Sequence, residues 1–242
     1  KFIRQHDPVQ HRKAVNAMQR TPWKVNERVL KVQESIYKRN LGIGLPSNLT
    51  VAIPLFPEHL NDIPKEALTD AQKVEVGTWK VLAKAAYGRE KKRQSAVIAF
   101  MQSFKTAQEL SDWEEFYYVY TCDFRGRIYC ATSGLSPQGA DTAKGVIQFA
   151  RSARLGVSGV KWLAVQGANT YGVDKVSYDD RVAWIKENEG SIRRTIEDPI
   201  GSREWWGEAD KPYQFLAFCY EWADCDYGRN TNAQSSIPVG LD

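Results

Sequence analysis

The sequence changes character near residue 116, and this change restricts the possible folds most. Before it, apolar residues recur at helical spacing. Residues 14–39 and residues 67–110 both predict helices, and four prolines between positions 46 and 64 predict an extended connector between them. In the first helical region one face carries apolar residues at positions i, i+4, i+7 and i+11: Val25, Val29, Val32 and Ile36.

After the change, residues 116–129 (FYYVYTCDFRGRIY) are rich in aromatic and β-branched side chains, which favour strands, and Gly126 predicts a turn. Helical patterns return at about residue 158, over residues 182–196 and over residues 213–222. The tail SSIPVGLD predicts a short apolar strand. Helices followed by a small sheet interrupted by helices predict an α+β fold rather than an alternating parallel one.

Composition is consistent with a folded core. The chain has 242 residues, of which 12% are aromatic, including 8 tryptophans. No apolar run approaches the ~20 residues of a membrane span, and the basic start lacks the apolar core of a signal peptide. The net charge of +4 permits nucleic-acid binding without requiring it. The cysteines lack zinc-type spacing and are expected to be reduced structural thiols: Cys122, Cys130, Cys219 and Cys225.

The segment from Thr121 to Tyr129 is the strongest candidate for chemistry. Arg125 and Arg127 flank a glycine, and two guanidinium forks beside an accessible backbone suit bidentate phosphate contacts. The Tyr129 ring could stack on a base or sugar. The alternative is a β-turn with solvated arginines and Asp123 as their structural partner. Spacing alone leaves both interpretations open.

The string DFRGR (123–127) resembles the DxxGR motif of the single-subunit DNA-directed RNA polymerases of phages and mitochondria. Further strings resemble the same family in order and at similar spacing. They are TPWKVNERVLKV (21–32), SPQGADTAKG (136–145), VQGANTYGVDKV (165–176), ENEGSI (187–192), EWW (204–206), FLAFCYEWA (215–223) and IPVGLD (237–242). Collinear agreement of several uncommon strings is more specific than any one of them, and it spans most of the chain.

The resemblance implies a right-hand polymerase fold that is incomplete without fingers. It assigns consecutive parts of the chain to a lead-in (1–22), a helical thumb (23–115), the first part of the palm (116–150), a mainly helical palm insertion (151–234) and a palm strand (235–242).

The resemblance also implies roles for individual residues. Arg125, Arg127 and Tyr129 match residues that contact template and hybrid near the active centre. Lys144 matches a lysine close to nucleic acid, and Lys175 matches one that reaches the nucleotide's triphosphate or the departing pyrophosphate. Without the resemblance, Lys175 would be an ordinary surface lysine. A basic cluster in the thumb either meets the phosphate backbone or forms a solvated helix face: Arg89, Lys91, Lys92 and Arg93.

Asp242 carries the chemistry that the resemblance implies. Nucleotidyl transfer uses two Mg²⁺ ions about 3.5–4 Å apart, and such hard cations need carboxylates on rigid strand ends. Asp242 matches the first metal-binding aspartate of the family, while the second carboxylate lies outside this chain. Without the resemblance, Asp242 would be an ordinary strand-end residue. The implied partners are the DNA template, the nascent RNA and NTPs.

The sequence lacks the family's fingers, its remaining palm motifs and its promoter-binding domain. We therefore expect either the small subunit of a split, heterodimeric phage polymerase or a fragment of a longer chain, with the split enzyme favoured. A second subunit would carry the fingers and remaining palm, and an accessory promoter or single-stranded-DNA factor would assist, in the cytoplasm of an infected bacterial host. Two rival interpretations are a non-catalytic nucleic-acid-binding protein derived from a polymerase, and a DNA polymerase with a related palm.

Overall fold

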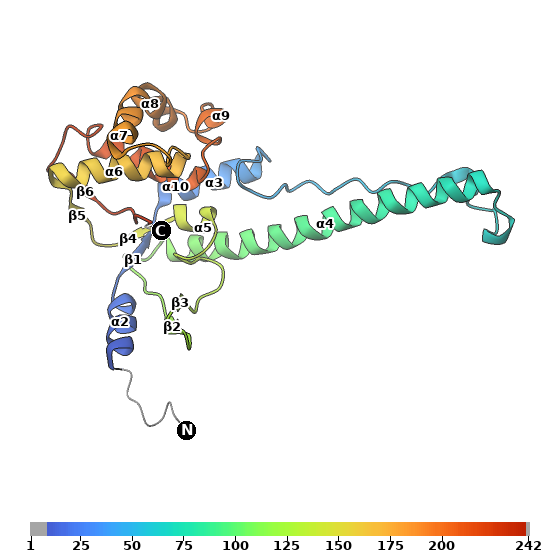
Figure 1. Cartoon of the computed structure of the whole chain (residues 1–242), viewed down its shortest axis with the longest axis horizontal. Helices are drawn as coiled ribbons and strands as arrows, with labels where there is room; N and C mark the ends of the chain where they lie inside the picture. Colours follow the sequence, from blue (N-terminus) through green and yellow to red (C-terminus); the bar gives the residue numbers. More distant parts are fainter. Residues whose placement is uncertain (1–8, 241–242) are drawn as a thin grey trace. The chain divides into compact units, whose positions relative to one another are not determined.

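The computed structural model describes residues 9–240 of the chain. The chain divides into two compact units. The larger unit combines the residues up to position 45 with those from position 100 onward, and the smaller unit is residues 46–99. Figure 1 labels the elements along the chain, and the long helix α4 (Asp70–Leu110) contributes residues to both units.

The start of the larger unit differs from the single helix predicted over residues 14–39. In its place the structure has helix α2 (Val9–Gln19), strand β1 (Trp23–Val25) and helix α3 (Glu27–Lys38). Pro22 lies in the break, and a proline inside a helix would remove a backbone hydrogen bond. The backbone of Trp23 instead exchanges two hydrogen bonds of 2.8 Å with Phe116. Long-range strand pairing therefore overrides the helical spacing of Val25.

The remainder of the predicted apolar face is confirmed. Val29, Val32 and Ile36 are all buried on α3. The helix begins after Asn26, whose side-chain oxygen accepts a hydrogen bond from the Val29 backbone N–H at 3.3 Å. This is the usual way to satisfy one of the free N–H groups at a helix start.

The strands form two-stranded antiparallel ribbons in the part of the chain that the structure describes. The pairs are β1 with β4 (Ile147–Phe149), β2 (Tyr120–Cys122) with β3 (Ile128–Cys130), and β5 (Ala153–Arg154) with β6 (Gln234–Ser235). The strands predicted within residues 116–129 are confirmed as the β2–β3 hairpin. Its turn holds Gly126 at a φ of +79°, a conformation that glycine adopts without steric cost.

The predicted C-terminal strand is shorter than expected. Strand β6 ends at Ser235, and residues 236–240 have no regular strand structure. The partner strand β5 has only two residues, and Pro238 lacks the N–H that a longer ladder would use. Asp242 lies outside the described residues.

The helical stretches predicted after about residue 158 are confirmed, with one interruption. The helices after β3 are α5 (Asp141–Gly145), α6 (Gly156–Tyr171), α7 (Tyr178–Glu187), α8 (Glu189–Glu197), α9 (Arg203–Trp206) and α10 (Pro212–Asp224). Residues 182–196, predicted as one helix, are divided between α7 and α8 at Asn188, whose side chain donates to the Trp184 carbonyl at 2.9 Å. Helices with a few short strands agree with the predicted α+β class.

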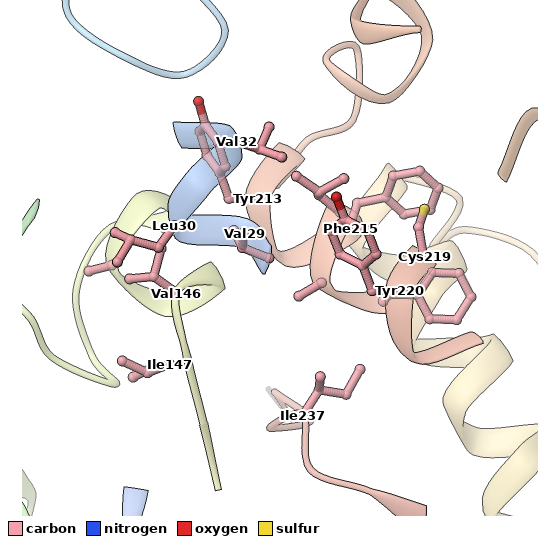
Figure 2. Close-up of a cluster of buried hydrophobic side chains, with 14 of the residues drawn as sticks. Val29, Leu30, Val32, Val146, Ile147, Tyr213, Phe215, Cys219, Tyr220 and Ile237 are labelled. Carbon is pink, nitrogen blue, oxygen red and sulfur yellow. The ribbon is translucent and has the colours of Figure 1, made fainter. Parts of the chain in front are cut away.

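Helix α10 lies at the centre of the larger unit and contacts α3, α5, α6 and α8. Phe215, Leu216 and Phe218 are fully buried on it. Figure 2 shows the surrounding cluster, in which side chains of α3, of the β4 region and of the C-terminal segment gather around α10. Because the C-terminal segment adds Ile237 to this core, the core also helps to fix the approach to residue 240.

In the smaller unit an extended strap, residues 46–57, packs against part of α4. This agrees with the extended connector that the prolines between positions 46 and 64 predict. The Trp79 indole N–H donates to the Pro54 carbonyl at 3.0 Å, and the Phe56 ring meets Trp79 edge-on at 4.9 Å. Two short 3-10 helices, Glu58–Leu60 and Lys65–Ala67, lead into α4. Over residues 9–240, no helix is long and apolar enough to cross a membrane.

Candidate active site

The β2–β3 hairpin exposes the predicted arginines, and Asp123 organises its turn. One carboxylate oxygen of Asp123 accepts the backbone N–H groups of Arg125 and Arg127, both at 2.9 Å. Asp123 therefore holds the backbone of the turn, and both arginine side chains remain exposed. Arg125 lies over the Phe124 ring at 5.2 Å, and that ring is 93% exposed. An exposed aromatic beside a guanidinium is suited to a nucleic-acid surface.

The hairpin is braced at both edges by glutamine side chains. The Gln138 oxygen accepts the Cys130 N–H at 2.7 Å, and its amide nitrogen donates to the Ile128 carbonyl at 3.0 Å. On the other strand, Gln19 of α2 accepts the Tyr120 N–H at 3.0 Å. Tyr129 remains 44% exposed between these braces. Hydrogen bonds with Gln19 and Gln138 thus hold the hairpin backbone, while its polar and aromatic side chains face outward.

Two adjoining cavities lie beside the C-terminal segment. Both are lined by Lys144, Gln214 and Gly240. The first has a volume of about 250 Å³ and mostly apolar walls that include Trp23, whose buried indole N–H has no hydrogen-bond partner within the described residues. Its lining also includes residues 237–240, which precede Asp242 in the sequence.

The second cavity, of about 320 Å³, is polar and basic. Lys144 and Lys211 both line it, and neither forms an ion pair with any carboxylate among residues 9–240. Its wall also includes the half-exposed rings of Trp162 and Tyr178, whose centroids are 5.2 Å apart. Two ammonium groups beside aromatic rings, with Asp174 as the carboxylate in the lining, favour an anionic ligand such as a nucleotide. Lys211 was not predicted from the sequence, because an isolated lysine has no distinguishing pattern.

A half-buried carboxylate, that of Asp141, sets the orientation of α10 against this cavity. Asp141 accepts the backbone N–H groups of Tyr213 and Gln214 at 2.8 and 3.1 Å, and the Gln214 side-chain amide at 3.1 Å. The Asp141 side chain thus satisfies N–H groups at the start of α10 from outside the helix. Burial raises the pKa of Asp141, and the hydrogen bonds from Tyr213 and Gln214 and the charge of Lys211 offset that effect in part.

We expect Asp141→Asn to change how stability depends on pH. Because the pKa of Asp141 is raised in the folded state, its contribution to stability is fully present below the unfolded pKa of about 3.9 and is lost as pH rises through the folded pKa. The stability of the native protein relative to the Asn variant should therefore fall with rising pH, by about 1.4 kcal/mol for each pH unit that separates the folded pKa from the unfolded pKa. Urea unfolding between about pH 3 and pH 7 measures this. Asp112→Asn, which makes the same chemical change at an exposed site, is the matched control.

The C-terminal segment is held on both sides at Ser236. The Ser236 carbonyl accepts the Phe149 N–H at 2.8 Å. The backbone N–H of Ser236 donates to the buried Glu221 carboxylate at 2.5 Å. Glu221 lies on α10, so the central helix and strand β4 together fix the backbone that leads toward Asp242. No sequence pattern indicates this role, since nothing in the sequence distinguishes Glu221 from Asp224, the other acidic residue of the mostly apolar helix α10.

Lys175 lies in the loop between α6 and α7. Its side chain is 88% exposed, and its ammonium bonds to Asp174 at 3.0 Å, which holds the pKa of that carboxyl below its usual range. Asp174 lines the polar cavity with Lys144, whereas Lys175 lies outside its lining. The hairpin residues Arg127 and Tyr129 do not line either cavity.

The basic cluster on α4 belongs to the smaller unit and is not uniform. Arg93 forms a two-bond pair with Glu90 at 2.7 and 2.8 Å and donates to the Ser47 carbonyl at 3.0 Å. This pairing lowers the pKa of Glu90 to about 2. Arg93 therefore ties the strap to the helix, whereas the remaining members of the cluster are exposed: Arg89, Lys91 and Lys92.

Metal-binding groups are sparse in the described residues. Within residues 9–240, no group of three or more His, Cys, Asp or Glu side chains could hold a metal ion. The four cysteines are free thiols, with Cys219 and Cys225 buried.

Comparison with known proteins identifies the relatives of this chain. Residues 153–242 match the family model described as DNA-dependent RNA polymerase. The DNA-directed RNA polymerase of Enterobacteria phage K11 is 35% identical over 232 residues, which cover 95% of this chain and 24% of that protein. This chain is a homologue of the phage DNA-directed RNA polymerases. T7 RNA polymerase of Escherichia phage T7 is 34% identical over 232 residues, covering 95% of this chain and 25% of the phage enzyme.

The homology extends to organellar polymerases. The mitochondrial DNA-directed RNA polymerase 1 of Arabidopsis thaliana is 32% identical over 209 residues, covering 85% of this chain and 20% of that protein. The resemblance to phage and mitochondrial RNA polymerases, which short strings such as DFRGR carry, is therefore confirmed over most of the chain. The chain spans about a quarter of the length of its phage relatives.

Proposed function

We propose that this chain takes part in DNA-templated RNA synthesis, as the thumb and first palm portion of a right-hand polymerase. The observation that carries the proposal is the basic cavity beside Gly240, two residues before Asp242, in a chain homologous to RNA polymerases. Lys144 and Lys211 would attract the nucleotide's phosphates there. The β2–β3 hairpin would present Arg125, Arg127 and Tyr129 to template and hybrid.

Asp242 is proposed as the carboxylate that this chain gives to catalytic Mg²⁺. When bound, the two metal ions would lower the pKa of the attacking 3′-hydroxyl and balance charge on the triphosphate. The residues of this chain would hold the carboxylate in place, because Glu221 and Phe149 fix the backbone at Ser236 and Ile237 is buried in the core.

In the smaller unit, Arg89, Lys91 and Lys92 are proposed to lie along the phosphate backbone of nucleic acid. Such contacts are independent of sequence and weaken as salt rises. Arg93 is left out of this set because its guanidinium is engaged by Glu90. A protein that only binds nucleic acid would keep these contacts and have no use for Asp242, which distinguishes this alternative.

Lys175→Ala tests the nucleotide-binding part of the proposal. In the polymerase that contains this chain, we expect the KM for NTPs to rise about tenfold with little change in kcat. The reason is that the variant loses a charge-assisted contact to phosphate, of about 1.5 kcal/mol. Primer extension on a DNA template over a range of NTP concentrations measures both constants. Lys186→Ala, on the exposed side of α7, is the matched control. An unchanged KM would remove Lys175 from the nucleotide site.

A further inference from the structure

Arg181, on α7, makes three hydrogen bonds around the loop that carries Lys175. Its Nη2 donates to the Asp174 carbonyl at 2.6 Å, and its Nε donates to the Val176 carbonyl at 3.1 Å. These are the backbone groups immediately before and after Lys175. Its Nη1 donates to the Asn169 side-chain oxygen at 2.8 Å, which ties the loop to helix α6. One side chain therefore connects the loop to both of the helices that flank it.

The fixed shape of the guanidinium explains why this position needs arginine. Three different nitrogens in one rigid plane reach three acceptors, and a lysine ammonium, a single point on a flexible stem, cannot span them. The group also lies over the Tyr178 ring, with its carbon 5.0 Å from the ring centroid. Contacts on the edge and on the face of the guanidinium together restrict its position.

Lys175, by contrast, has little support of its own. Its side chain is 88% exposed, and its only side-chain hydrogen bond within the described residues is with the neighbouring Asp174. The point from which the Lys175 side chain extends is set by the backbone of residues 174–176. Arg181 holds the two carbonyls that define that backbone.

We propose that Arg181 is a positioning residue that fixes the loop at residues 174–176 and so presents the Lys175 ammonium to the nucleotide's phosphates. This inference rests on the proposed role of Lys175. Arg181 lines the polar cavity, so it could instead bind phosphate directly. The observed geometry favours positioning, because three of its five guanidinium N–H groups, one on each nitrogen, already donate to the protein.

A double-mutant cycle in the polymerase that contains this chain separates these roles. Arg181→Lys keeps the positive charge but replaces the planar guanidinium, with its several N–H donors, by an ammonium. It should raise the KM for NTPs about fivefold with kcat nearly unchanged. In the Lys175→Ala background the same substitution should have almost no further effect on KM. Equal effects of Arg181→Lys in both backgrounds would overturn the inference and leave the role of Lys175 intact. A silent Lys175→Ala would overturn both.

Trypsin provides a readout that does not depend on activity. If Arg181 fixes the loop, Arg181→Lys should speed cleavage after Lys175 by about fivefold, because proteolysis tracks local opening. Arg194→Lys, on α8, makes the same chemical change at a residue that donates only one side-chain hydrogen bond within residues 9–240, to Ser191, and should leave both KM and this cleavage unchanged. An unaltered cleavage rate in Arg181→Lys would contradict a positioning role.

Discussion

Asp242→Asn should abolish RNA synthesis by the polymerase that contains this chain, with a fall in kcat of about a thousandfold or more. An amide keeps the shape of the side chain and removes the negative charge that a hard cation requires. Loss of several kcal/mol of transition-state stabilisation at a metal centre corresponds to this factor. Steady-state extension of an RNA primer on a DNA template, with saturating NTPs and Mg²⁺, measures it.

Two further measurements show whether the loss is specific. Binding of the primer–template should be unchanged in Asp242→Asn, because the hairpin arginines and the basic residues of α4 are untouched. Asp112→Asn makes the same chemical change at an exposed site and should retain full activity. RNA synthesis that survives Asp242→Asn would refute the metal-ligand assignment and favour a protein that only binds nucleic acid.

Much of the fold could be predicted because burial repeats at regular spacing. Val29, Val32 and Ile36 reveal one face of a helix, and the aromatic run before Gly126 reveals a hairpin. The prediction failed at Val25, which fits the helical spacing but lies in a strand. Periodicity reports only local geometry, whereas the pairing of β1 with Phe116 and with β4 joins residues about a hundred positions apart.

The candidate site was predicted by resemblance rather than by spacing. Lys144 and Lys175 are ordinary lysines in the sequence, and only the collinear family strings indicate roles for them. The residues that support the site were missed, because Arg181, Asp141 and Glu221 act on backbone N–H and carbonyl groups. Such acceptors and donors are the same at every position, so the sequence carries no pattern for these contacts.

Gly167→Ala should destabilise the larger unit by about 2 kcal/mol. Gly167 lies on α6 against α10, and an added Cβ would be 2.4 Å from the Phe218 ring. That ring is fully buried and stacks against both Phe215 and Trp222, each with a centroid at 5.7 Å, so it has little space to move. Overpacking costs about 1–3 kcal/mol or more, which exceeds the gain of about 1 kcal/mol in helix propensity. Urea unfolding followed by tryptophan fluorescence measures the loss.

The matched control is Gly190→Ala on α8, where the nearest atom to an added Cβ is a flexible arginine nitrogen at 3.9 Å. There the helix-propensity gain is unopposed, and we expect stability to rise by about 0.5–1 kcal/mol. A second substitution tests the cause directly. Phe218→Leu removes the ring that the methyl group added at position 167 would strike, so the two changes should be less than additive when combined. Full additivity would mean that the cost at Gly167 does not come from the contact between α6 and α10. It would also mean that the close approach of these two helices does not set the position of the wall of the polar cavity.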